Sequence, residues 1–254
     1  MSARGSAFAA GQRVFGLGMI AVGVVGLMWA QPLPSHFPGY ADLVYGLVTL
    51  AGAAVLWPRT AAWGAGALAL YYALVVVIYK IGPVLLLHYN VYGPYENLAE
   101  GLAIASGALL VFAANAAIDP TLAMRLTQAG QIAFGVCAVI FGGAHFAYMN
   151  LTAPLVPKWL PPSQEFWACA TGIAQIAAGA AILSRVWARL AVRLLAAMYA
   201  SFIPLVFAPI LMADPSNHFR WNECVETLAL TGVAWIVAES LAGSTWRRTA
   251  SGPA

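Results

Sequence analysis

The chain consists of long apolar runs separated by short segments that contain proline, glycine or charged residues. The runs cover about residues 14–30, 41–57, 62–80, 98–118, 131–149, 166–184, 190–212 and 223–243. Each run is about long enough to cross the hydrocarbon core of a bilayer as a helix. None shows the two-residue alternation that is typical of a strand in a membrane barrel. The pattern predicts an all-α integral membrane protein with eight transmembrane helices.

The composition excludes the soluble and disordered classes of protein. Hydrophobic residues make up 62% of the 254 residues and charged residues 8%, whereas a soluble domain has about 25% charged residues. The net charge of +3 is small and is spread along the chain, so nucleic acid is not an expected partner. The expected surroundings are the lipid bilayer.

Basic residues predict the orientation of the helices. With a cytoplasmic N-terminus, the inner segments would hold nine arginines and the outer segments three cations. The inner set is Arg4, Arg13, Arg59, Arg125, Arg185, Arg189, Arg193, Arg247 and Arg248, and the outer set is Lys80, Lys158 and Arg220. This bias follows the positive-inside rule. We therefore expect a bacterial inner (plasma) membrane protein with both termini in the cytoplasm.

The two halves of the chain resemble each other. Phe15-Gly16 near the start of the first run matches Phe134-Gly135 in the fifth, and the segment 46–56 (GLVTLAGAAVL) matches 172–183 (GIAQIAAGAAIL). Four spans in each half keep both halves in the same orientation. The sequence predicts a parallel internal duplication with two tandem four-helix bundles, residues 1–125 and 126–254.

The second half carries a family signature. GGAHF, APLVPKWLPP, FW and TG follow one another between Gly142 and Gly172, and the matching residues are His145, Phe146, Pro154, Pro157, Trp159, Leu160, Pro161, Trp167, Thr171 and Gly172. This signature resembles the DoxX-like family of small bacterial membrane proteins over about residues 131–243, and the first half resembles a divergent copy. The resemblance implies a four-helix unit that is redox-associated, linked to quinones or to the oxidation of sulfur compounds. The first half departs from the signature, with Gly26 at the position of His145, and family members often have a glutamate where this chain has Gln175.

Paired glutamates are the first candidates for chemistry. Glu96 and Glu100 are four residues apart, and Glu223 and Glu226 three apart, at the outer starts of matching spans. They could border a cavity that holds a proton or a cationic ligand, or they could complement helix dipoles among the lipid headgroups. Lys80 needs a glutamate partner if its span continues through Pro83 to His88; otherwise its side chain snorkels to the headgroups.

His145 lies one turn before the outer end of its span. Together with Asn150, Trp159 and Glu226 it could bind a quinone head, a sulfur oxyanion or a small neutral ligand, or it could be a structural histidine. The three cysteines have no CxxC spacing, no two histidines share a helix and no paired haem ligands occur, so neither a metal nor a haem site is predicted. A diffusible quinone is the cofactor left open.

Three functions remain open, and no catalytic residue can be assigned. They are a redox-associated membrane subunit, a small-molecule permease or binding protein, and a non-catalytic assembly partner. In the last, the proline-rich VPKWLPP loop would dock a membrane or periplasmic protein. The candidate ligand-binding residues are His145, Glu100, Glu226, Lys80, Trp159 and Asn222.

Overall fold

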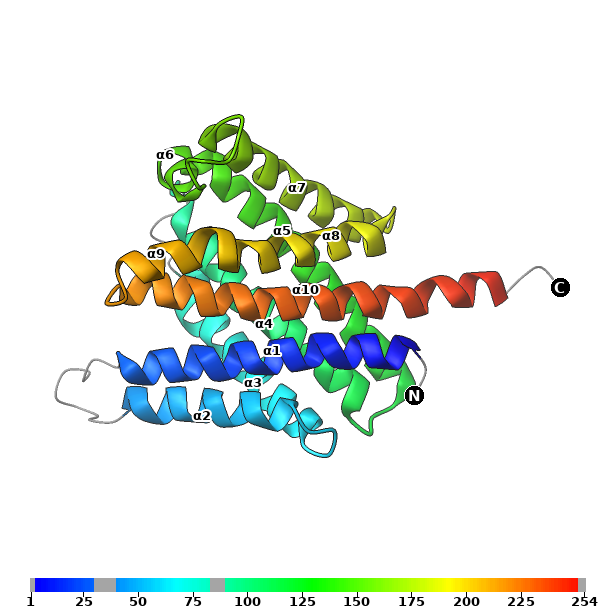
Figure 1. Cartoon of the computed structure of the whole chain (residues 1–254). Coiled ribbons are helices and arrows are strands. Elements are labelled where there is room, and N and C mark those ends of the chain that lie inside the picture. The colour runs from blue at the N-terminus through cyan, green and yellow to red at the C-terminus, as the bar shows by residue number, and fades with distance from the viewer. Residues whose placement is uncertain (1–2, 30–39, 83–89, 251–254) are drawn as a thin grey trace.

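The computed structural model describes residues 3–29, 40–82 and 90–250, and this part of the chain contains helices and no strand (Figure 1). The main helices are α1 (Ala3–Met28), α2 (Tyr40–Val55), α3 (Ala61–Val75), α4 (Gly93–Asn115), α5 (Pro120–Ala147), α7 (Gln164–Ser184), α8 (Ala188–Phe202) and α10 (His218–Ala250). Short helices α6 (Met149–Thr152) and α9 (Ala208–Ala213) follow α5 and α8.

Seven helices in the described residues are long and apolar enough to cross a membrane. They are Gly5–Met28, Ala61–Lys80, Gly93–Asn115, Pro120–Ala147, Gln164–Ser184, Ala188–Ala213 and His218–Leu241. The molecule is therefore a multi-pass membrane protein. The expected count of eight is supported for only seven, because α2 has 16 residues and rises roughly 24 Å, less than the roughly 30 Å of a hydrocarbon core.

The helices form a closed ring. Each of α1 to α4 packs against the next, α4 packs against α5, and α5, α7, α8 and α10 continue the series until α10 packs against α1. Helix α10 also contacts α4 across the middle of the ring. In Figure 1, α10 runs beside α1, and the two chain ends lie at the same end of the bundle. We call this the terminal end, and we call the opposite end, where α4 and α10 begin, the acidic end.

Glycines bring the backbones of α1 and α10 into close contact. A Cβ atom on Gly18 would meet the backbone of Ala229, and one on Gly232 would meet the backbone of Phe15. Small residues allow such an approach, which provides the packing that holds helices together in lipid. The first and last long helices are thereby joined, and Phe15 becomes fully buried between them.

Several polar side chains inside the ring are paired across helices. Asn115 on α4 donates through Nδ2 to Gln12 Oε1 on α1 at 3.2 Å, and Gln12 donates to the carbonyl of Val55 at 2.8 Å. Gln131 on α5 donates to Ser240 Oγ on α10 at 2.8 Å. Such pairing is required where no water is present.

Two helices, α3 and α8, change pitch at their C-terminal ends. Helix α3 continues as a π-helical segment, η1 (Val76–Lys80), and α8 continues as another, η4 (Ile203–Phe207), which leads into α9. A π-helical turn is rare and is frequently found at functional sites. In α8 it coincides with Pro204, which has no N–H to continue the ladder; in α3 it ends at Lys80.

We predict that Gly18→Leu destabilises the bundle, because the new side chain would collide with the α10 backbone at Ala229. Overpacking of this kind costs about 1–3 kcal/mol or more. The matched control is Gly46→Leu on α2, where a Cβ atom meets nothing within 4 Å. Thermal unfolding in mild detergent should show a clear fall in melting temperature for Gly18→Leu alone. Equal stability of the two variants would contradict the described packing of α1 on α10.

Candidate functional site

Six polar residues from three helices gather at the acidic end of the bundle. Glu96 and Glu100 come from α4, Asn222, Glu223 and Glu226 from α10, and Lys80 from η1. We call this set the acidic centre. Because α4 and α10 pack together, Glu226 lies within electrostatic range of Glu100, Lys80 and Glu223. Glu100 likewise interacts with Lys80 and Glu223.

Lys80 enters the acidic centre from the π-helical turn. Its Nζ atom donates to the backbone carbonyl oxygen of Asn97 at 2.5 Å and lies 3.4 Å from Asn97 Oδ1. The stem packs beside Gly101 on α4, where a Cβ atom would lie 3.7 Å from Lys80 Cδ, an ordinary van der Waals distance. The lysine therefore binds a carbonyl oxygen directly and acts on the carboxylates through its charge.

The charges of the acidic centre do not balance within the described part of the chain. Arg220 pairs with Glu223 at 2.6 Å, and Glu226 accepts a hydrogen bond from Asn222 Nδ2 at 3.1 Å. Glu96, Glu100 and Glu226 form no ion pair with a described residue. Glu100 and Glu226 lie within electrostatic range of Lys80, and Glu96 lies within range of Glu100 and Glu223. Half-buried carboxylates at membrane depth need a counter-charge or a proton.

Tyrosines border the acidic centre. Tyr92, which precedes α4, donates its hydroxyl to the carbonyl of Ile140 at 2.7 Å and packs edge to face against Tyr148. Burial raises the pKa of both phenols, and the negative charge of Glu96 raises the pKa further. Tyr72 on α3 lies within electrostatic range of Glu226. These rings connect the acidic centre to the neighbouring end of α5.

His145 belongs to a second cluster, inside the second half of the chain. Its Nε2 atom lies 2.8 Å from Nε2 of Gln175 on α7, and Tyr199 on α8 donates to Gln175 Oε1 at 3.4 Å. With the amide donating, His145 Nε2 is the acceptor and its proton lies on Nδ1 in the neutral ring. Nδ1 is buried and has no partner among the described residues. Gln175 thus contacts the histidine of the GGAHF segment.

Trp159 lies on the proline-rich loop after α6, and 70% of the residue is exposed. Two side chains hold this loop against α7: Gln164 donates to the carbonyl of Val156 at 2.5 Å, and Trp167 donates to that of Pro161 at 2.8 Å.

The contacts described for His145 and Trp159 include no residue of the acidic centre. The expected single site therefore divides: Glu100, Glu226, Lys80 and Asn222 are brought together, whereas His145 and Trp159 lie elsewhere.

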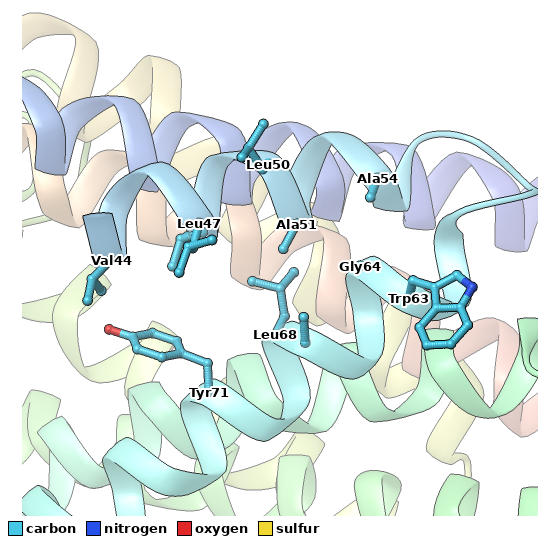
Figure 2. Close-up of a pocket in the computed structure, with 11 residues that line it drawn as sticks. Val44, Leu47, Leu50, Ala51, Ala54, Trp63, Gly64, Leu68 and Tyr71 are labelled. Carbon is cyan, nitrogen blue, oxygen red and sulfur yellow. The ribbon is translucent and has the colours of Figure 1, made fainter. Parts of the chain in front are cut away.

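Two apolar grooves run along the outside of the bundle. One, of about 340 Å³, lies between α7, α8 and the proline-rich loop and is lined by residues that include Leu160, Trp167 and Phe202. The other, of about 410 Å³, lies between α2 and α3. Figure 2 shows Leu47, Leu68 and Tyr71 around the second groove. The apolar linings of both grooves suit hydrocarbon chains.

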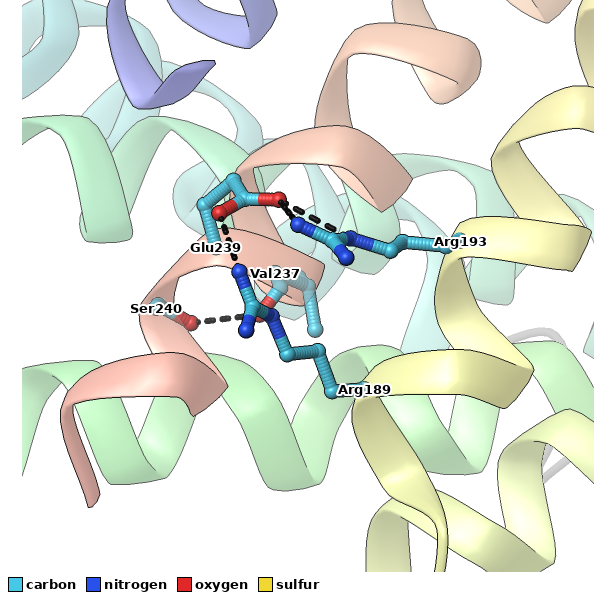
Figure 3. Close-up of polar contacts among 5 residues, drawn as sticks. All are labelled: Arg189, Arg193, Val237, Glu239 and Ser240. Atoms are coloured by element: carbon cyan, nitrogen blue, oxygen red, sulfur yellow. Dashed lines mark hydrogen bonds and ion pairs between the residues drawn. The ribbon is translucent and has the colours of Figure 1, made fainter. Parts of the chain in front are cut away.

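The carboxylates at the terminal end are already engaged. Asp119 caps α5 by accepting hydrogen bonds from the amides of Thr121 and Leu122 at 2.8 and 3.0 Å. Glu239 on α10 pairs with Arg189 at 3.0 Å and with Arg193 at 2.6 Å. Figure 3 shows both guanidinium groups converging on this carboxylate. Neither acidic group is available to continue a polar path from the acidic centre.

The described residues contain no group of three or more His, Cys, Asp or Glu side chains arranged to hold a metal ion. The sequence reasoning found the glutamate pairs but missed the contact of Gln175 with His145 and that of Tyr199 with Gln175. No motif pointed to Tyr199, and a hydropathy pattern does not show which faces of two helices meet.

Comparison with known proteins yields one match. A family model described as a domain of unknown function (DUF8561) matches residues 134–230, from α5 into α10. The chain matches no curated protein and no solved structure. The matched segment contains the cluster of His145, Gln175 and Tyr199 and only one side of the acidic centre.

We predict that Glu226→Gln raises the melting temperature by a few degrees. The change removes one of the two carboxylates that share Lys80, while the amide keeps the shape and can still bond Asn222. Binding sites commonly have lower stability than the fold allows. Glu165→Gln is the control, because Glu165 is exposed in the first turn of α7 and favourably placed at a helix N-terminus. If Glu226→Gln melts below wild type, the carboxylate is a stabilising partner and not an excess charge.

Proposed function

We propose that the chain is a DoxX-like, redox-associated protein of a bacterial inner membrane, and that its acidic centre exchanges protons on the outer side for a lipid-soluble quinone. The observation that carries the proposal is that Glu100 and Glu226, from two helices, share the ammonium group of Lys80, while Glu96 lies within electrostatic range of Glu100 and Glu223. Carboxyl groups held so close at membrane depth are neutralised by protons or by a bound cation.

Quinone chemistry needs such a group. A quinone becomes a quinol by taking up two electrons and two protons, so a site for the reaction must deliver protons to a molecule that stays in the bilayer. The acidic centre supplies them. The electrons come from oxidation of a sulfur compound on a membrane or periplasmic partner protein, in keeping with the DoxX-like resemblance. Lys80 and Asn222 are the donors suited to the quinone oxygens.

Passage of a solute through the bundle is less well supported. A pathway needs polar groups that continue to the other face of the membrane. Asp119 serves as a helix cap and Glu239 is held by two arginines, so the described residues leave no free carboxylate at the terminal end.

An assembly role is the second candidate, and it rests on Trp159. A side chain that is 70% exposed on a loop fixed by two hydrogen bonds has the form of an interface anchor. It is compatible with the first proposal, because the partner that supplies electrons has to dock at the outer side.

We further propose that the fold is a parallel duplication. The contacts of α1 to α4 parallel those of α5, α7, α8 and α10, and each half gives its last helix to the first helix of the other half. The π-helical segments at residues 76–80 and 203–207 occupy matching places. The pair Gln12–Asn115 likewise matches Gln131–Ser240.

The proposed activity is tested with membranes that contain the protein and its native partners. We expect reduction of decylubiquinone that depends on thiosulfate or another sulfur compound, and a severalfold loss of rate in Glu100→Gln and Glu226→Gln. Glu165→Gln should keep the wild-type rate. Mild-detergent purification followed by mass spectrometry should recover bound quinone. If neither quinone binding nor such reduction is found, with or without partners, the redox proposal fails.

The orientation is tested by labelling single cysteines in a background without native cysteines. Lys158→Cys in the proline-rich loop should react with a membrane-impermeant maleimide in intact cells. Thr60→Cys, in the exposed turn between α2 and α3, should react only after permeabilisation. The reverse pattern would place both termini outside and turn the acidic centre toward the cytoplasm.

A further inference from the structure

A hollow of about 410 Å³ lies between α1, α8 and α10 near the terminal end of the bundle. One stretch of its wall consists of methyl side chains from Ala7, Ala197 and Ala200, with the indole of Trp235 beside them. The other end of the hollow is polar and is formed by Arg193 and Glu239. An apolar trough with a charged end is the shape of a site for an amphipathic molecule.

The charged end carries a positive excess. The carboxylate of Glu239 is 4% exposed and accepts bonds from both Arg189 and Arg193. One carboxylate cannot neutralise two guanidinium groups, and the side chain of Arg193 remains 49% exposed. Arg185, which precedes α8 and donates to Gln131 Oε1 at 2.5 Å, adds a third positive charge nearby.

We propose that this hollow binds an anionic phospholipid. The phosphate contacts Arg193 at the exposed side of its ion pair with Glu239, and one acyl chain lies along the alanine-lined wall. Glu239 orients the two arginines, so its role is to position them and not to bind the lipid. Basic pockets between transmembrane helices are established sites for anionic headgroups.

The placement of the hollow favours a lipid over a free anion. Its alanine wall belongs to segments that are apolar enough to cross a membrane, and Ala197 and Ala200 are exposed on the outside of the bundle. A free phosphate would leave that wall uncovered. A zwitterionic lipid carries its own cation, which offsets its attraction to Arg193. The charge and shape together select an anionic lipid.

The test measures lipid binding by the purified protein in mild detergent, by native mass spectrometry and by the shift in melting temperature. The probes are dioleoylphosphatidylglycerol, dioleoylphosphatidylcholine and inorganic phosphate. Arg193→Gln removes the charge, and Ala197→Trp fills the trough while keeping every charge. The control is Arg125→Gln on α5, an exposed arginine in the first turns of that helix.

We expect wild type and Arg125→Gln to bind phosphatidylglycerol in preference to phosphatidylcholine. Arg193→Gln should weaken that binding about fivefold, the factor expected for one basic side chain at an anionic surface, and Ala197→Trp should weaken it at least as much. Should Arg193→Gln fail to fold, Ala197→Trp decides alone. Equal binding of the two lipids, equal protection by inorganic phosphate, or full binding by Ala197→Trp would overturn the proposal.

Discussion

Hydrocarbon offers no hydrogen-bond partners, so each polar group inside this bundle has to be paired within the protein or carry a counter-charge. This constraint accounts for the amide and hydroxyl pairs that link α1 with α4 and α5 with α10. It also accounts for the two arginines that hold Glu239 at the terminal end. In the acidic centre, Glu96, Glu100 and Glu226 form no ion pair with a described residue, and protons are the neutralising partners that we propose for them.

The packing of the ring puts the acidic centre where it is. The close approach of α1 to α10 at Gly18 and Gly232 closes the ring, and the contact of α4 with α10 then brings two glutamate-bearing helix starts together. The π-helical turn before Lys80 carries a cation into the same region from a third helix. Three separate segments are thus needed to assemble one site. For this reason no single motif in the sequence indicates it.

The sequence predicted the helical membrane class because length and hydropathy decide it, and it identified the glutamate pairs because charge is rare in such a chain. The eighth span that it predicted is not confirmed, because α2 has only 16 residues in the described part of the chain and an apolar run does not show where a helix begins. The depth expected for Lys80 depended on residues 83–88, which lie outside the described residues. His145 was grouped with Glu226 because both lie near the outer ends of spans. Hydropathy does not reveal that the histidine faces Gln175.

Infrared difference spectroscopy of the carboxyl groups tests the central claim most directly. Membranes that contain the protein would be measured before and after decylubiquinone is reduced in their presence. If the acidic centre exchanges protons with the quinone, a carboxyl C=O stretching band changes in wild type and in Glu165→Gln and is absent from Glu226→Gln. A spectrum without a carboxyl band, or the same band in Glu226→Gln as in wild type, would contradict the account.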